Sequence, residues 1–323
     1  MSAPLYSFIV PIYRDAGLAE AFCTEFEQVL GDYLGIEDLS EQVELIFVND
    51  DGTAETAELL RETSERHPFA KVINLSRNFG HHIALSCGFD HAQGDVVGMI
   101  NVDMEDPPDQ IPLLLDTLEK GDYDTVVGLR EGREASAWER MTSHAFNWFL
   151  NKATGYDMPL NAATLRVMNR RFMDAYRRFT ERSRYQPGLE LWLGFRRGYV
   201  PIRQSRRTQG KSSYTFRRRL KLAFEAVISF SDLPLRFSVA LGAIVALIGF
   251  ALTAYLAIGE LFFLEFQAGY TSTITAIVLL GGVLIFVIGL ASLYIGRILS
   301  EVQGRPRYVI RDSVNISVRE PHG

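Results

Sequence analysis

The chain has 323 residues, 47% hydrophobic and 22% charged, and this composition excludes an intrinsically disordered or collagen-like protein. The formal net charge of −6 argues against a general nucleic-acid-binding protein. The two cysteines, Cys23 and Cys87, cannot form a disulfide framework or a thiolate zinc site by themselves. Because single hydrophobic cores stop growing at roughly 250 residues, we expect a globular domain with an additional part.

The first half of the chain alternates predicted strands and helices. Short, β-branched apolar runs predict buried strands at Tyr6–Ile12, Val43–Val48, Lys71–Leu75, Asp95–Asn101 and Thr125–Leu129. Segments with helical spacing lie between them, at Leu18–Leu34, Thr53–Arg66, His82–Ala92 and Ile111–Lys120. This alternation predicts an α/β domain with a mostly parallel sheet and helices on both faces. Ligands of such sheets bind at the carboxyl ends of the strands.

Two long apolar segments follow, Leu235–Ile258 and Ile274–Gly296, and their only charged residue is Arg236. Each is long enough to cross about 30 Å of hydrocarbon as a helix, and the alternative is a buried hairpin in a soluble core. The connector 259–273 has no Lys or Arg, whereas basic residues flank both segments. The positive-inside rule therefore predicts that both ends of the hairpin lie in the cytoplasm.

The segment 215–234 begins with basic residues and continues with apolar ones. This pattern predicts a helix in the lipid headgroup region, and the alternative is an amphipathic helix packed on the soluble domain. The N-terminal sequence lacks the basic and apolar regions of a signal peptide, so we expect the first domain to stay in the cytosol. The expected organisation is a cytosolic catalytic domain at 1–214, an interfacial helix at 215–234, a transmembrane hairpin at 235–296 and a cytosolic tail at 297–323.

An acidic loop, Asn101–Asp109, directly follows a predicted strand. Its four carboxylates belong to Asp103, Glu105, Asp106 and Asp109. Crowded carboxylates favour a bound divalent cation, and hard oxygen ligands favour Mg²⁺ or Mn²⁺. The alternative is a solvated acidic loop that starts the next helix at Asp106-Pro107.

A second acidic pair, Asp50 and Asp51, follows the strand Val43–Val48 and is expected at the same edge of the sheet. Asp50 is placed to accept hydrogen bonds from a ribose or a base, while the alternative is an ordinary Asp-Gly turn. The chain has neither the P-loop motif GxxxxGK[ST] nor the dinucleotide-binding motif GxGxxG. The phosphates of a bound nucleotide must therefore be held in another way.

Several of these segments, in this order, resemble the family 2 glycosyltransferases with a GT-A fold, specifically the polyprenyl or dolichyl phosphate sugar transferases. The segments are Phe8–Tyr13, Val48–Asp50, Ser76–Gly80, Asp103–Pro108 and Arg207–Tyr214. The two apolar spans are similar to those of the bacterial GtrB-like and ArnC-like branch.

The resemblance implies a role for particular residues. Pro11, Tyr13, Asp50 and Arg77 would contact the nucleotide-sugar donor, which is expected to be UDP-linked. Asp103 would ligate Mg²⁺ or Mn²⁺ on the donor diphosphate, with Glu105 close to that metal. The resemblance also assigns the lipid phosphate to a loop with four contacting residues, Arg207, Lys211, Ser212 and Tyr214. Asp103, Arg207 and Lys211 would carry the catalysis.

The segment Asn161–Arg166 has no carboxylate where many members of the family have acidic residues, and Asn101 occupies the first position of the family's D-x-D motif. In the family, this segment often supplies the proposed catalytic base. In this chain, either another residue acts as that base or the reaction needs no base. The second reading is chemically reasonable, because a phosphate monoester has a second pKa near 6 and is mostly a dianion at neutral pH.

The resemblance implies a membrane-bound inverting enzyme that moves one sugar from a nucleotide sugar to polyprenyl phosphate. The reaction would take place at the cytoplasmic face of the bacterial inner membrane, and related enzymes form tetramers, so we expect a homo-oligomer. A processive polysaccharide synthase is less favoured, because the chain has no Q-x-x-R-W segment and no further spans. A membrane-anchored binding or scaffold protein with a degenerate transferase domain is the third possibility.

Overall fold

A computed structural model describes residues 5–130, 159, 161–181, 186–203, 235, 237–245, 247–249, 251 and 269–318. These residues fall into two compact units. The first contains the described residues up to 203 together with 305–318, and the second contains those between 235 and 304. The chain therefore leaves the first unit, forms the second and returns to the first.

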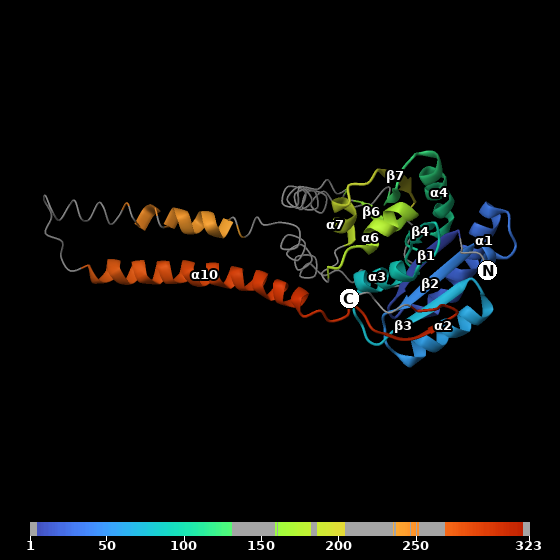
Figure 1. Cartoon of the computed structure of the whole chain (residues 1–323), viewed down its shortest axis with the longest axis horizontal. Coiled ribbons are helices and arrows are strands. Elements are labelled where there is room, and N and C mark those ends of the chain that lie inside the picture. The colour runs from blue at the N-terminus through green and yellow to red at the C-terminus, as the bar shows by residue number, and fades with distance from the viewer. Residues whose placement is uncertain are drawn as a thin grey trace. The chain divides into compact units, whose positions relative to one another are not determined.

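The described part of the first unit is built on an eight-stranded sheet with the order β7-β5-β6-β4-β1-β2-β3-β8. Figure 1 labels β7, β6, β4, β1, β2 and β3 of this sheet. The strands are β1 (Tyr6–Ile12), β2 (Val43–Asn49), β3 (Ala70–Leu75), β4 (Val96–Met99), β5 (Thr125–Arg130), β6 (Ala162–Asn169), β7 (Arg197–Ile202) and β8 (Ile310–Val314). Neighbouring strands pair in parallel except at β6 and β8, which are antiparallel to their neighbours. The mostly parallel sheet expected from the sequence is confirmed.

Among the described helices of this unit, those up to residue 120 follow the expected alternation, and two more follow after residue 169. They are α1 (Ala19–Leu34), α2 (Ala54–Arg66), α3 (His81–His91), α4 (Ile111–Lys120), α6 (Arg170–Arg177) and α7 (Gln186–Trp192), with short 3-10 turns at Ala16–Leu18, Leu39–Glu41 and Pro108–Gln110. Local signals set their ends: Thr53 accepts a hydrogen bond from the Thr56 amide before α2, and Gly35 ends α1 in the left-handed conformation.

Helices cover both faces of the sheet, as successive residues of β1 show. Phe8 packs edge-on against Phe26 of α1, with the ring centroids 5.2 Å apart. Ile9 points to the opposite face and lies against α3 so closely that a Cβ on Gly88 would come within 2.3 Å of its Cγ2 atom. Both side chains are fully buried, so the strand is sandwiched between two layers of helix.

The second half of the domain contains elements that the sequence analysis did not predict: β6, β7, β8, α6 and α7. The strand β8 belongs to the segment 297–323, which the sequence analysis treated as a tail. It pairs with β3 and closes one edge of the sheet, with Val72 opposite Val314 and Asn74 opposite Asp312.

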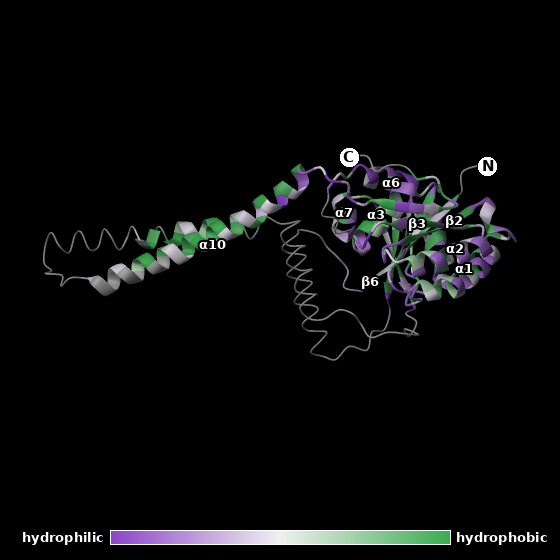
Figure 2. Cartoon of the chain, turned by 90° about the horizontal axis from the view of Figure 1, so that it is seen from below, coloured by the Kyte–Doolittle hydropathy of each residue, from purple (hydrophilic) through white to green (hydrophobic). Residues whose placement is uncertain are grey.

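The second unit contains α10 (Tyr270–Val302), in which Leu280–Val302 is apolar enough to cross a membrane and is not buried within the chain. Figure 2 shows the hydrophobic residues along this helix. Among the described residues it is the one helix that meets this length and composition. The first expected span, 235–258, lies partly outside the described residues, so the two-helix hairpin stays a prediction. The expected interfacial helix, 215–234, lies outside them.

Candidate active site

The loops that the sequence analysis singled out meet at one edge of the sheet. The strands β4, β1 and β2 are adjacent and parallel, so their carboxyl ends point the same way. Backbone hydrogen bonds extend this pairing: the Asp50 amide donates to the Ile12 carbonyl at 2.9 Å, and the Ile100 amide donates to the Ile9 carbonyl at 3.1 Å. The acidic loop after β4 and the Asp50 turn after β2 therefore flank the end of β1, as expected from the sequence.

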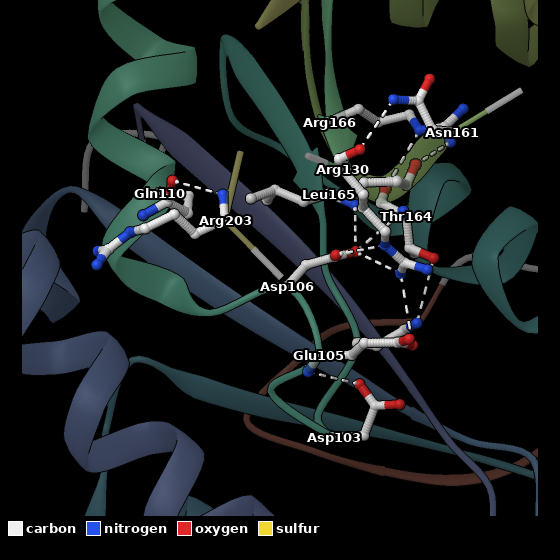
Figure 3. A network of polar contacts seen from close by, with 12 residues as sticks. Asp103, Glu105, Asp106, Gln110, Arg130, Asn161, Thr164, Leu165, Arg166 and Arg203 are labelled. Atoms are coloured by element: carbon white, nitrogen blue, oxygen red, sulfur yellow. Dashed lines mark hydrogen bonds and ion pairs between the residues drawn. The ribbon is translucent and has the colours of Figure 1, made fainter. Parts of the chain in front are cut away.

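Asp106 anchors the acidic loop to β5 and β6. Its carboxylate accepts two hydrogen bonds from the Arg130 guanidinium, at 2.8 and 3.0 Å (Figure 3). The backbone amides of Thr164 and Leu165 donate to the same carboxylate at 3.1 and 3.4 Å. Because Asp106 is buried and engaged on several sides, its role is to fix the loop rather than to bind a ligand.

Arg130 also reaches Glu105, at 3.5 Å from its carboxylate. Burial alone would lower the pKa of Arg130, but the hydrogen bond and the charge of Asp106 outweigh it and raise that pKa. The guanidinium therefore stays charged and links two neighbouring carboxylates of one loop. The local sequence does not indicate this role of Arg130, because its partners lie 24 and 25 residues earlier in the chain.

Asp103 stands at the turn of the acidic loop, where it accepts a hydrogen bond from the Glu105 amide at 3.2 Å (Figure 3). Met104, between them, adopts a left-handed conformation with φ of 56°. Both carboxylates are partly exposed, in contrast to the buried Asp106. The tight turn thus holds Asp103 and Glu105 at the open side of the loop.

These two carboxylates fit a Mg²⁺ or Mn²⁺ ion that is shared with a substrate. Mg²⁺ in proteins is commonly bound by one or two carboxylates together with substrate phosphates and waters, rather than by a cage of protein ligands. Within the described residues, no group of three or more His, Cys, Asp or Glu side chains forms such a cage. Asp103 and Glu105 could take part in a site of the first kind, and their role as metal ligands stays a prediction.

The Asp50 carboxylate holds the loop that starts α3. It accepts hydrogen bonds from the Phe79 and Gly80 amides at 2.6 and 2.8 Å, and from the Asn78 side chain at 3.1 Å. Burial raises the pKa of Asp50, while the two amide hydrogen bonds and the charge of Arg77 act in the opposite direction. The structure gives Asp50 this anchoring role, and its contact with a nucleoside stays a prediction.

The other residues expected at the donor surround the same edge. Pro11 lies in β1 and is partly exposed, and Tyr13 follows the strand with 45% of its surface exposed. The Arg77 guanidinium lies over the Phe79 ring, 4.2 Å from its centroid. These side chains offer an aromatic surface and a cation beside the acidic loops.

The segment without carboxylates, Asn161–Arg166, meets the acidic loop through Asn101. The Asn101 amide donates to the Thr164 hydroxyl at 3.2 Å. Behind it, the buried Arg166 forms an ion pair with Glu190 of α7, with 2.6 Å between the Nη1 and Oε2 atoms. Glu190 was not expected at this position, since nothing in its local sequence indicates a buried partner on another element.

Four residues expected to bind the acceptor phosphate, Arg207, Lys211, Ser212 and Tyr214, lie outside the described residues. Their roles stay predictions.

The mostly parallel sheet, with acidic loops at the carboxyl ends of β2 and β4, defines an α/β domain of GT-A type. Residues 7–178 match the family model described as glycosyl transferase family 2. The chain therefore belongs to this family, and the family resemblance drawn from the motifs is confirmed.

The relatives are similar over nearly their whole length. The chain is 33% identical to an uncharacterized glycosyltransferase of Synechocystis sp. over 307 residues, which cover 95% of this chain and 94% of that protein. It is 32% identical to a prophage-derived bactoprenol glucosyl transferase of Shigella flexneri, with coverage of 95% and 97%. It is 30% identical to an undecaprenyl-phosphate 4-deoxy-4-formamido-L-arabinose transferase of Edwardsiella ictaluri, with coverage of 95% and 94%.

Proposed function

We propose that this protein is a membrane-bound inverting glycosyltransferase. It moves a single sugar from a nucleotide sugar, with UDP the favoured nucleotide, to polyprenyl phosphate. The observation that carries the proposal is the position of Asp103 at the carboxyl end of β4, in a loop fixed by the Asp106–Arg130 pair beside the Asp50 turn. The names of the Shigella and Edwardsiella relatives support the lipid phosphate as acceptor.

The acidic loop would hold the divalent cation. Asp103 and Glu105 are the residues for this role, and the cation, when bound, would screen the donor diphosphate and stabilise negative charge on the leaving group. Arg130 keeps Glu105 and Asp106 in one arrangement, so the loop needs little reorganisation when the donor binds.

The transfer itself is a single displacement. An oxygen of the lipid phosphate attacks the anomeric carbon, and the bond from that carbon to the diphosphate oxygen breaks, so the nucleoside diphosphate leaves with the electron pair. The acceptor is mostly a dianion at neutral pH, which supports a reaction without a general base near Asn161–Arg166. Arg207 and Lys211 would hold the lipid phosphate in line, assisted by Ser212 and Tyr214.

The membrane part would place this site at the lipid surface. The apolar helix α10 supports a membrane anchor, and the preceding apolar segment 235–258 is proposed as the other span of a hairpin. The basic residues on both sides of the hairpin favour a cytoplasmic catalytic domain. Self-association in the membrane is supported by the small residues Gly281, Gly282 and Gly289 on α10, because small residues permit close approach of helices in a membrane.

The test is sugar transfer by the full-length protein in detergent. The acceptor is a short polyprenyl phosphate, the donors are a panel of UDP and GDP sugars, and each reaction runs with Mg²⁺, with Mn²⁺ or with EDTA. We expect product from a UDP sugar, lost in EDTA and lost in Asp103→Asn.

Asp109→Asn is the matched control. Asp109 is the last residue of the same loop, and its carboxylate forms an exposed ion pair with Arg203. This variant should keep its activity. Folded protein that transfers no sugar from any donor would refute the proposal and favour the binding or scaffold protein.

A further inference from the structure

The C-terminal strand β8 contributes to a polar row that crosses the sheet. Asp312 lies directly opposite Asn74 in the β3–β8 ladder, and Asn74 lies opposite Asn49 in the β2–β3 ladder. Asn49 is the last residue of β2, directly before the Asp50 turn. Four elements of the domain are therefore aligned at one level: β8, β3, β2 and the turn that follows β2.

Hydrogen bonds connect this row without a break. The Asn74 amide group donates to the Asp312 carboxylate, and the Asn74 carbonyl oxygen accepts from the Asn49 amide group at 2.8 Å. The Asn49 oxygen then accepts from the backbone amide of Asp51 at 3.0 Å. A carboxylate at one end can only accept and a backbone N–H at the other end can only donate, so both asparagine amides are fixed in orientation.

The middle of this row is buried, whereas Asp312 at its end keeps 51% of its side-chain surface exposed. Asn49 and Asn74 are 0% and 2% exposed, so neither side chain can exchange its partner for bulk water. Leaving a buried donor without its acceptor costs more than the hydrogen bond itself contributes. Loss of the Asp312 carboxylate would therefore release Asn74 to reorient, and with it the acceptor that holds the Asp51 amide.

A second contact joins the same strand to the same turn. Arg311 donates from Nη1 to the Gly52 carbonyl oxygen at 3.1 Å and from Nε to the Asp312 carboxylate at 2.7 Å. Gly52 has a left-handed φ of 74°, and a Cβ there would come within 3.3 Å of the Arg77 backbone. The turn is thus confined between the 76–80 loop and the C-terminal strand.

We propose that Asp312 is a positioning residue of the donor site. Through Asn74 and Asn49, with Arg311 in support, it holds the Asp50–Gly52 turn in the conformation that receives the nucleotide. This inference rests on the proposed function and on the expectation from the sequence that Asp50 contacts the nucleotide of the donor. It also explains why the chain returns to the sheet after α10: the last strand completes the support of a turn more than 250 residues earlier in the sequence.

The test measures UDP and GDP binding to the full-length protein by isothermal titration calorimetry in the presence of MgCl₂. Asp312→Ala should weaken UDP binding about tenfold, which corresponds to the loss of one charged hydrogen bond. Asp312→Asn keeps an acceptor oxygen for Asn74 and should stay within about threefold of the unchanged protein. Ser313→Ala is the matched control, because Ser313 is next in β8 and bonds to the Ile316 carbonyl instead.

Thermal unfolding of each variant identifies a folding defect. If Asp312→Ala does not fold, Arg311→Met carries the test, since its partly exposed side chain can be shortened without opening the core, and about threefold weaker UDP binding is expected. Unchanged UDP binding in the folded variants would overturn the inference, as would equal losses in Asp312→Asn and Asp312→Ala. Absence of UDP and GDP binding in the unchanged protein would instead overturn the proposed function, and this inference with it.

Discussion

Arg130 at the end of β5 and Asp106 in the acidic loop form a two-pronged ion pair, with bonds of 2.8 and 3.0 Å. The Asp106 side chain is fully buried, whereas Arg130 keeps 23% of its side-chain surface exposed. The pair fixes the loop that carries Asp103, so stability and metal binding are expected to depend on the same guanidinium.

Replacement of Arg130 by Met should therefore affect both properties. The buried Asp106 charge would lose its partner, and we expect about 3 kcal/mol less stability in urea unfolding. The Mn²⁺ concentration for half-maximal transfer should rise, because Glu105 also loses its contact. Arg130→Lys keeps the positive charge but offers only a point charge, so its stability and its Mn²⁺ requirement should lie between those of the unchanged protein and those of Arg130→Met. Arg203→Met removes an exposed ion pair and serves as the control; an equal loss there would contradict this account.

The anchoring role of Asp50 predicts a large effect of Asp50→Ala. Two backbone amides at the start of α3 and the Asn78 amide would lose their acceptor. We expect a loss of about 2 to 3 kcal/mol in unfolding free energy, together with faster amide hydrogen exchange at Phe79 and Gly80. Asp38→Ala removes an exposed carboxylate that bonds only locally to Ser40 and should change stability far less. Unaltered exchange at Phe79 and Gly80 would refute the anchoring role.

The buried pair of Arg166 and Glu190 predicts strong non-additivity. Arg166→Met leaves the Glu190 charge buried without its ion-pair partner and should cost about 3 to 5 kcal/mol. The double variant Arg166→Met/Glu190→Leu removes both charges and should recover much of that loss. Chemical unfolding of the single and double variants measures the coupling. Additive losses would show that the two side chains act independently.

If α10 crosses the membrane, an added charge should be tolerated only near its end. Ile288 lies inside Leu280–Val302, with 55% of its surface exposed. Ile288→Arg should disfavour insertion by about 2.5 to 3.5 kcal/mol, and the protein should shift from the carbonate-resistant membrane fraction to the soluble or aggregated fraction. Val302→Arg, at the end of the span, is the control and should stay in the membrane. Equal membrane retention of both variants would argue against a span at this position.

The amino-acid sequence determined the first half of the sheet almost to the residue. Tyr6–Ile12 and Ala70–Leu75 form strands where β-branched apolar runs predicted them, because a strand buried on both faces needs a mostly apolar sequence. It did not reveal β8, whose sequence Ile-Arg-Asp-Ser-Val is polar and forms a strand by pairing with β3 at the edge.

The location of the candidate site also followed from sequence, since parallel strands bring the loops after β2 and β4 to the same edge. The tertiary structure decided which acidic residues there are anchored and which stay partly exposed. Asp106 and Asp50 are buried against partners from distant segments, Arg130 and the 78–80 loop, while Asp103 and Glu105 stay at the open side. The physical reason is that the environment of a carboxylate depends on the donors that the fold brings to it, and local sequence does not specify those donors.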